Sequence, residues 1–219
     1  HAQAEIERLT EQMKAEQAGK QPLRIAVSRD EAFCFIYEAN MDLLRKFGAE
    51  VIPFSPIHDS QIPDADGVLF YGGYPELFAK QLSENTFMRS DVKRKLAEGM
   101  PCMAECGGFM YLHQSMEDMD GTAWPEAGVI EGKAYKTSKL GRFGYIELHP
   151  VEEPEADRVL RGHEFHYFDS TSCGESYVAK KPLRKRSWRC IHETETLMAG
   201  FPHLYYYASP EFILKFLKK

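Results

Sequence analysis

The sequence predicts one α/β domain whose central sheet is mostly parallel and is covered by helices on both faces. Two observations favour this fold class. Short apolar segments alternate with helical segments through the first half of the chain, a pattern typical of parallel sheets with helices on each side. The chain also has 219 residues, which is enough to bury the core of one such domain but short for two enzymes.

The first half of the chain supplies four candidate strands of this sheet. They are residues 23–27, 50–54, 67–71 and 101–105. Helices are expected at about 36–47, in a stretch ending near residue 82, and at 84–99. Because the carboxyl ends of parallel strands meet at one edge of a sheet, the Gly72-Gly73 loop and Cys106 are expected at the same edge.

The second half of the chain is less regular. Strand-like segments are predicted near 128–135, 142–149, 161–168, 176–180 and 188–191. One more buried run lies within 197–207, and a short helix is expected over 210–217. No internal repeat and no low-complexity tract is visible.

The opening segment predicts a helix over about 2–18, because Ile6, Leu9 and Met13 recur three and four residues apart. Gly19 to Pro22 ends it. We therefore divide the chain into a helical connection over residues 1–22 and a folded domain over 23–219. Since the chain begins with histidine rather than methionine, we expect this helix to be the remnant of an interdomain linker.

Cys106 is the strongest candidate for a catalytic residue. It follows the apolar strand 101–105 and precedes Gly107 and Gly108, which open an apolar helix. A sharp strand-to-helix turn strains the backbone at one residue, lifts its side chain to the carboxyl edge of the sheet and needs small neighbours. A thiol at a helix N-terminus also meets aligned N–H groups, which favour the thiolate. The turn predicts acyl transfer through a cysteine thioester, whereas Cys102 has the character of a buried core residue.

Composition excludes several classes of function. The formal net charge of −6 argues against general nucleic-acid binding, and the basic run 180–186 is expected to be a solvated hairpin loop. No stretch approaches the ~18 apolar residues of a membrane span, and no signal peptide is visible. Five cysteines at irregular spacing suit a reducing compartment better than a disulfide framework. We therefore expect a cytoplasmic protein with neither nucleic acid nor membrane as a partner.

Six motifs follow one another along the chain. They are RDEAFCF at 29–35, FSPIHD at 54–59, GGYPEL at 72–77, AECGGFMYL at 104–112, GHEFHY at 162–167 and PHLYYY at 202–207. Through them the chain, from about Arg24 to its end, resembles the glutamine amidotransferase domain of the cobyrinic acid a,c-diamide synthase family, a branch of the class I glutaminases. The resemblance implies a flavodoxin-like domain that releases ammonia from glutamine and feeds it to an ATP-dependent synthetase domain.

The resemblance also implies roles for particular residues. Cys106 matches the nucleophile that attacks the glutamine side-chain amide, and His203 matches the base toward that thiol and the acid toward departing ammonia. The backbone N–H of Gly107 and one from the loop of Gly72 and Gly73, with Gly73 preferred, are expected to form an oxyanion hole. Each such donor is worth roughly 3–4 kcal/mol.

Two other histidines compete with His203. His163 and His166 lie three apart on a candidate strand, so they are expected on opposite faces. One of them can therefore reach the cleft while the other packs or faces solvent. We keep His166 as the reserve general base.

The chain departs from the common class I pattern at one position. Most class I glutaminases carry a glutamate two residues after the histidine, whereas this chain carries Tyr205. A third group normally orients the imidazole, so the orienting group is left unassigned. The corrin-amidating branch resembles this chain in lacking that glutamate, which supports the branch assignment and puts efficient unassisted glutaminase activity in doubt.

No cofactor site is expected within this chain. The sequence has no G-x-x-x-x-G-K-[ST] loop, and Cys102 and Cys106 have helical rather than zinc-binding spacing. The resemblance assigns ATP and Mg²⁺ to an N-terminal synthetase domain that this chain lacks. The chain is then expected to be a piece of a longer protein, with a separately encoded glutaminase subunit as the alternative, and glutamine, the synthetase domain and a tetrapyrrole as partners.

Three alternatives to a cobyrinic acid enzyme stay open. A sibling that amidates nickel-sirohydrochlorin or hydrogenobyrinic acid would carry the same domain, and cobyric acid synthase is less favoured because of the residues at 162–166. A non-catalytic docking module would keep the turn at Cys106 as architecture alone. A cysteine peptidase or thiol-stress protein would show no glutamine dependence, and the motifs at 72–76 and 162–166 argue against it.

Overall fold

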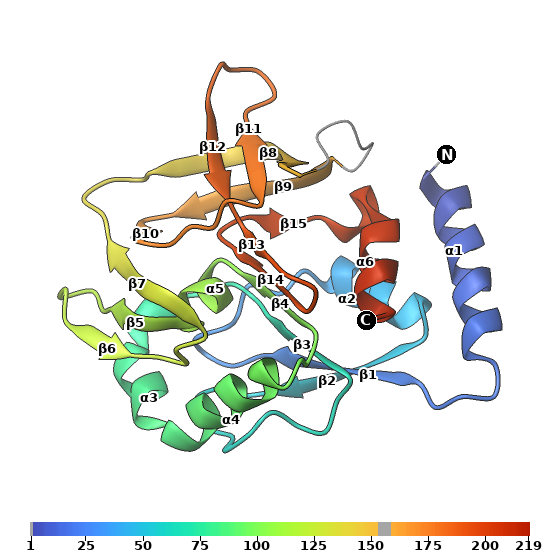
Figure 1. The fold of residues 1–219 in the computed structure, drawn as a ribbon, viewed down its shortest axis with the longest axis horizontal. Coiled ribbons are helices and arrows are strands. Elements are labelled where there is room, and N and C mark those ends of the chain that lie inside the picture. The colour runs from blue at the N-terminus through green and yellow to red at the C-terminus, as the bar shows by residue number, and fades with distance from the viewer. Residues whose placement is uncertain (1, 153–158) are drawn as a thin grey trace.

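The computed structural model of the protein describes residues 2–152 and 159–219 (Figure 1). Its elements follow in the order α1 (Ala2–Gln17), β1 (Leu23–Ser28), α2 (Glu38–Lys46), β2 (Ala49–Phe54), β3 (Gly67–Phe70), η1 (Pro75–Leu77), α3 (Ala79–Glu84), α4 (Thr86–Ala97), β4 (Cys102–Glu105), α5 (Gly107–Tyr111), β5 (His113–Glu117), β6 (Ala123–Pro125), β7 (Ile130–Lys136), β8 (Arg142–Pro150), β9 (Leu160–His166), β10 (Phe168–Ser170), β11 (Tyr177–Lys180), β12 (Ser187–Cys190), β13 (His192–Glu193), β14 (Leu197–Gly200), β15 (His203–Leu204), η2 (Tyr206–Ala208) and α6 (Pro210–Leu217). The strands predicted in the first half and the terminal helix are confirmed, whereas β5 and β6 were not predicted.

Six strands form the central sheet in the order β13-β14-β4-β3-β1-β2. Its neighbouring strands pair in parallel, apart from β13, which runs antiparallel to β14. The predicted mostly parallel sheet is therefore confirmed. Because β4 lies between β3 and β14, the carboxyl ends of these three strands share one edge, where sites form in open parallel sheets.

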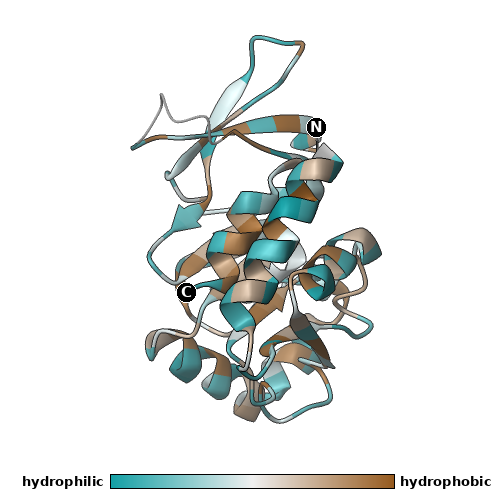
Figure 2. Ribbon diagram, turned by 90° about the vertical axis from the view of Figure 1, so that its right-hand side faces the viewer, coloured by the Kyte–Doolittle hydropathy of each residue, from teal (hydrophilic) through white to brown (hydrophobic). Residues whose placement is uncertain are grey.

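Helices cover both faces of this sheet, as predicted. Along β1 the side chains alternate, so Ile25 and Val27 join one buried cluster while Ala26 joins another. Helices α1, α2 and α6 contribute to the first cluster, and α3, α4 and α5 to the second. Figure 2 shows brown and teal bands along these helices, consistent with one apolar face on each.

The first helix is part of this core. Ile6, Leu9 and Met13 are each no more than 3% exposed and belong to the same buried cluster as α6. On the outer side of the two helices, Lys218 pairs with Glu16 at 2.7 Å. The apolar stripe expected from the sequence is therefore buried in the fold. The domain boundary after residue 22 and the linker origin of this helix stay predictions, and His1 lies outside the described residues.

We expect Leu9→Ala to lower the free energy of unfolding by about 2–5 kcal/mol, because it removes a buried side chain and leaves a cavity between α1 and the core. Urea unfolding followed by circular dichroism measures this change. Glu11→Ala, at an exposed position of the same helix, should change stability by less than about 0.5 kcal/mol. Equal unfolding midpoints for the parent and Leu9→Ala would show that α1 does not contribute to the core.

The second half of the chain adds two smaller sheets, which in the view of Figure 1 lie beside the central sheet and above it. One has the order β10-β7-β5-β6, and the other, β12-β11-β8-β9-β15, is antiparallel throughout. The basic run connects β11 to β12, which pair antiparallel, so the predicted hairpin loop is confirmed. These sheets matter for function because β9 and β15 carry three of the predicted histidines.

Candidate active site

Cys106 occupies the strained turn predicted from the sequence. Its backbone has φ 49° and ψ −106°, a left-handed conformation that is costly for a residue with a side chain. The backbone N–H of Cys106 donates to Gly200 at 2.9 Å, which ties the turn to the end of β14. A Cβ atom on Gly108 would lie 2.3 Å from the Phe70 carbonyl oxygen, so close packing of α5 against β3 requires glycine there. The sequence thus builds a nucleophile elbow at the shared edge of β3, β4 and β14.

The thiol of Cys106 is in a different state from the one expected. Its side chain is buried, and burial together with the nearby Glu76 carboxylate raises the pKa of the Cys106 thiol above its ordinary value. The Gly107 N–H lowers this pKa but does not outweigh burial. The N–H at the start of α5 therefore acts in the predicted direction, but α5 has only five residues and desolvation of the sulfur dominates, so the thiol and not the thiolate is favoured. The thiol needs a base.

His203 follows Gly200 by three residues, and its Nδ1 lies 3.8 Å from Oε2 of Glu105, the residue directly before Cys106. Its ring stacks on His163 at 5.0 Å between centroids and meets the edge of Tyr37 at 6.1 Å. A Cβ atom on Gly72 would lie 2.4 Å from His203 Cε1, so this glycine lets the imidazole pack on the loop after β3. Burial lowers the pKa of His203 to about 3, which keeps the ring in its neutral, basic form at neutral pH.

The strand that carries His203 is fixed from two sides. His203 pairs with His163 on β9, and Leu204 pairs with Gly162, whose Cβ would lie 2.2 Å from the His203 carbonyl oxygen. On the other side, the buried Asn40 of α2 donates to the Leu204 carbonyl at 3.0 Å and accepts from the Tyr206 N–H at 3.1 Å. The backbone around His203 is therefore held rigidly.

The two glycines predicted for the oxyanion hole lie close together. A Cβ atom on Gly107 would lie 3.2 Å from the Gly73 amide nitrogen, and one on Gly73 would lie 2.0 Å from the Ala32 carbonyl oxygen. A side chain on Gly73 would therefore collide with the opposing backbone, and one on Gly107 would first meet Pro75 Cδ at 2.8 Å. The loop after β3 and the start of α5 thus approach each other closely next to Cys106, and the oxyanion-hole role of the two N–H groups stays a prediction.

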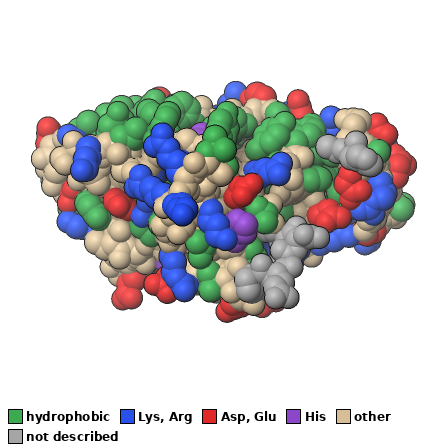
Figure 3. Space-filling view, turned by 90° about the horizontal axis from the view of Figure 1, so that it is seen from above, with side chains coloured by type: hydrophobic (Ala, Val, Ile, Leu, Met, Phe, Trp, Pro, Cys, Tyr) green, Lys and Arg blue, Asp and Glu red, His purple; other side chains and the backbone are tan. Residues whose placement is uncertain are grey.

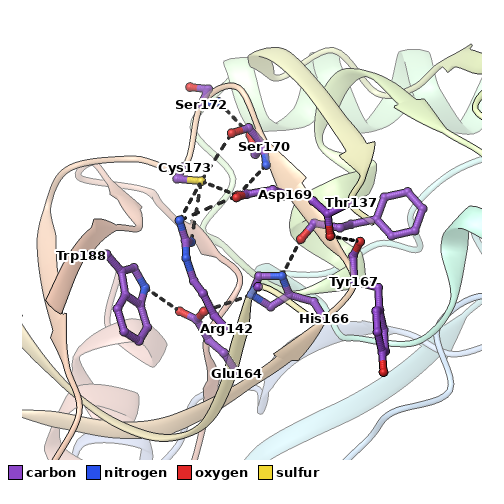
Figure 4. Close-up of polar contacts among 12 residues, drawn as sticks. Thr137, Arg142, Glu164, His166, Tyr167, Asp169, Ser170, Ser172, Cys173 and Trp188 are labelled. Atoms are coloured by element: carbon purple, nitrogen blue, oxygen red, sulfur yellow. Dashed lines mark hydrogen bonds and ion pairs between the residues drawn. The ribbon is translucent and has the colours of Figure 1, made fainter. Parts of the chain in front are cut away.

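His163 and His166 lie on opposite faces of β9, as predicted. The Tyr37 hydroxyl hydrogen-bonds to His163 Nε2 at 2.6 Å, on the side of His203. His166 Nδ1 donates to the Phe168 carbonyl at 2.6 Å, and its Nε2 bonds to Glu164 at 3.0 Å. Figure 4 shows His166 held by Glu164, which also accepts from Trp188. Because both ring nitrogens of His166 are engaged, the structure gives the reserve base no free lone pair.

A cavity of about 700 Å³ opens beside His203. It is lined by Tyr37, His163, His203 and Tyr205, among other residues, but Cys106 is not in its lining and is only 6% exposed. Exposed aromatic side chains lie on the nearby β8 and β9, namely Phe143, Tyr145 and Phe165. Figure 3 shows hydrophobic side chains gathered along one edge of this end of the molecule, with lysine and arginine side chains beside them.

The described residues contain neither a metal-binding cluster nor a membrane-spanning helix. Within residues 2–152 and 159–219, no group of three or more His, Cys, Asp or Glu side chains is arranged to hold a metal ion. In the same part of the chain, no helix combines the length and apolar character needed to cross a bilayer.

Sequence reasoning missed three residues at this site. Tyr37 packs against the His203 ring, and Glu76 raises the pKa of Cys106. Glu105, directly before Cys106, lies 3.8 Å from His203. A signal for Glu105 was present, because a carboxylate within a short, otherwise apolar strand is almost never fully buried unless it has a partner. Nothing in the sequence pattern identifies Tyr37, whose place depends on the packing of the chain before α2 against β9.

Solved structures share this fold. One described as a glutamine amidotransferase has a TM-score of 0.60, covering 89% of this chain and 97% of that one at 15% identity. PurLQS from Thermotoga maritima has a TM-score of 0.55, covering 83% of this chain and 87% of that one at 14% identity. The fold, with a cysteine elbow beside a buried histidine, is that of the class I glutamine amidotransferases. The predicted flavodoxin-like α/β class is confirmed.

Within this class, the chain belongs to the family of CobB/CobQ-like glutamine amidotransferase domains, whose family model matches residues 24–209. A cobyrinate a,c-diamide synthase of Caldanaerobacter subterraneus is 38% identical over 207 residues, covering 90% of this chain and 45% of that protein. One of Listeria innocua is 38% identical over 200 residues, covering 88% of this chain and 44% of that protein. The predicted family is confirmed, and the chain spans about half the length of the curated relatives it matches.

Proposed function

We propose that this chain hydrolyses the side-chain amide of glutamine through a thioester on Cys106 and supplies the ammonia to a synthetase domain that amidates the a and c carboxylates of cobyrinic acid. The observation that carries the proposal is the strained turn at Cys106, placed beside a buried, neutral His203 and two backbone amides. The names of the curated relatives support the assignment to cobyrinate.

The protonation states of Cys106 and His203 support general-base activation of the thiol. Burial keeps Cys106 protonated and His203 neutral, so an imidazole nitrogen takes the thiol proton as sulfur attacks the amide carbon. The carbonyl π electrons move to oxygen, where the N–H groups of Gly73 and Gly107 receive the charge. When the C–N bond breaks, the imidazolium returns the proton to nitrogen and ammonia leaves. Water then cleaves the thioester, which yields glutamate and the free thiol.

We assign ATP and Mg²⁺ to the synthetase domain rather than to this chain. The sequence offers no phosphate-binding loop of the P-loop type, and the described residues offer no cluster suited to a metal ion. The residues present therefore do not fit these groups, and no step of the proposed glutamine hydrolysis uses them. The greater length of the curated relatives supports a second domain as the partner.

The tetrapyrrole would be chosen by that second domain. A sibling enzyme that amidates nickel-sirohydrochlorin or hydrogenobyrinic acid is consistent with the same glutaminase site. Cobyrinic acid is favoured because the curated relatives named above are cobyrinate a,c-diamide synthases.

Active-site labelling tests the glutaminase proposal. We expect 6-diazo-5-oxonorleucine, a glutamine-mimicking electrophile, to form a single adduct on Cys106, and excess glutamine to block it. Intact-mass spectrometry followed by sequencing of the labelled peptide measures the result. Adducts spread over several cysteines, or insensitive to glutamine, would contradict a formed glutamine site.

One observation favours a second candidate, the docking module. Cys106 is nearly inaccessible and does not line the cavity beside His203. A folded chain that stays unlabelled both alone and within the longer protein would support this module. Labelling that appears only within the longer protein would instead show that the synthetase domain opens or aligns the site.

A further inference from the structure

The side chain of Glu105 faces His203 across the central sheet edge. It ends β4 and, by strand alternation, points to the opposite side from Cys106, into the cluster formed with α2 and α6. Glu105 Oε2 lies 3.8 Å from His203 Nδ1, and both residues are almost completely buried. Among the described residues, both of these atoms lack any hydrogen-bond partner. We infer that Glu105 is the positioning residue that orients the His203 imidazole for thiol deprotonation.

Pairing with each other satisfies both atoms. A buried polar atom without a partner is destabilising, so a shortening of this contact by less than about 1 Å stabilises both groups at once. Catalytic hydrogen bonds are often long in the free enzyme and shorten when substrate binds. The remaining oxygen of Glu105 is already fixed, because the Tyr206 hydroxyl donates to Oε1 at 3.4 Å and Tyr71 donates to Tyr206 at 2.8 Å.

The residue at the usual orienting position is not available. Tyr205 stands two residues after His203, but its side chain is 55% exposed and stacks on Tyr207 at 6.0 Å. Its hydroxyl is also a weak substitute for a carboxylate. Glu105 instead reaches the same imidazole from the residue directly before the nucleophile. The orienting group that the sequence left unassigned is thus supplied by β4.

This arrangement gives the site a pH dependence. Burial raises the pKa of Glu105 to about 8. Below that pH the carboxyl group holds a proton and donates it to Nδ1, which leaves the other nitrogen protonated and unable to accept from the thiol. Above it, the carboxylate accepts Nδ1–H and Nε2 becomes the base. The titratable groups that face or interact with this pair are Tyr37, Tyr71, Cys106, His163, His166 and Tyr206.

The inference rests on the proposed glutaminase function, and two readouts separate them. The first is the rate of Cys106 labelling by 6-diazo-5-oxonorleucine across pH 6–10 in the full 219-residue chain. We expect the wild-type rate to rise with pH through about 8. Glu105→Gln should lower the labelling rate at pH 9 by about tenfold to 10⁴-fold, where the upper figure is the loss when a triad carboxylate becomes an amide. It should also abolish the rise of the rate near pH 8, which we call the pH step. Glu105→Asp should keep the step.

Glu126→Gln is the matched control, because Glu126 is also a buried carboxyl without a hydrogen-bond partner but lies on the loop after β6, beside Arg89. It should leave both the rate and the pH step unchanged. A wild-type rate and pH step in Glu105→Gln would overturn the inference while leaving the glutaminase intact.

The second readout needs no activity. Nitrogen-15 NMR of labelled histidines, with His203 assigned through His203→Gln, should show its protonated nitrogen switching from Nε2 to Nδ1 as pH rises through about 8 in the wild type. This switch does not require glutamine to react. If the switch is seen but glutamine is not hydrolysed, the inference stands and the proposed function fails. A His203 ring that keeps its proton on Nε2 up to pH 10 in the wild type would refute the inference, whether or not Glu105→Gln folds.

Discussion

Cys106→Ser is expected to abolish glutamine hydrolysis, lowering the turnover rate by about 10⁶-fold, the scale of loss when a hydrolase loses its covalent nucleophile. A serine hydroxyl in this buried turn is a far weaker nucleophile than a thiol, because its proton is harder to remove. Glutamate release, followed by a coupled dehydrogenase assay, measures the effect in this chain and in the longer protein.

Cys102→Ser separates loss of the nucleophile from damage to the fold. Cys102 begins β4, the strand that leads into Cys106, and is only 1% exposed, so this control carries the same chemical change in a similarly buried place. We expect it to keep the wild-type turnover rate per folded molecule, even if its unfolding midpoint falls. Near-normal turnover in Cys106→Ser would remove Cys106 from the mechanism.

His203→Ala is expected to slow glutamine hydrolysis by about 10²–10⁴-fold, the usual contribution of a positioned general acid and base. The thiol is protonated at neutral pH because burial raises the pKa of Cys106, so without the imidazole no group removes the proton efficiently. The remaining rate should increase with pH, since hydroxide then generates the thiolate. A pH series of turnover rates from pH 6 to 10 measures both effects.

His166→Ala tests the reserve base in the same assay. His166 Nδ1 bonds to the Phe168 carbonyl and its Nε2 bonds to Glu164. We therefore expect His166→Ala to lower the stability of the fold and to leave the rate of the chemical step unchanged. Its turnover rate per folded molecule should stay within about threefold of the wild type, well below the range for a lost acid-base group. A loss in His166→Ala that equals or exceeds the loss in His203→Ala would exchange their roles.

Much of this fold was predictable from local sequence. The central strands and the helices between them carry their own apolar runs and end signals, and α6 begins and ends where the pattern predicts. The turn at Cys106 was predictable because it is followed by two glycines, at positions where an added side chain would meet close contacts, and such a glycine pair is visible in the sequence. By contrast, β5 and β6 escaped prediction, since these segments of five and three residues become strands through the pairing of β5 with β7 and with β6.

The chemical state of the site followed only from packing. A cysteine before two glycines suggests a thiolate, yet desolvation by neighbours from distant parts of the chain keeps the thiol protonated. Likewise, His163 and His166 were placed on opposite faces by strand periodicity alone, but the Phe201 ring that stacks on His166 at 4.0 Å comes from a distant part of the chain.

The sequence by itself therefore determined the fold class and the family, and it predicted Cys106 as the nucleophile, because these depend on neighbouring residues and on motifs with fixed spacing. The tertiary structure alone decided which carboxylate meets His203 and which protonation states the site holds. Those depend on distances and burial between β4 and β15, strands far apart in the chain, and no local pattern encodes them.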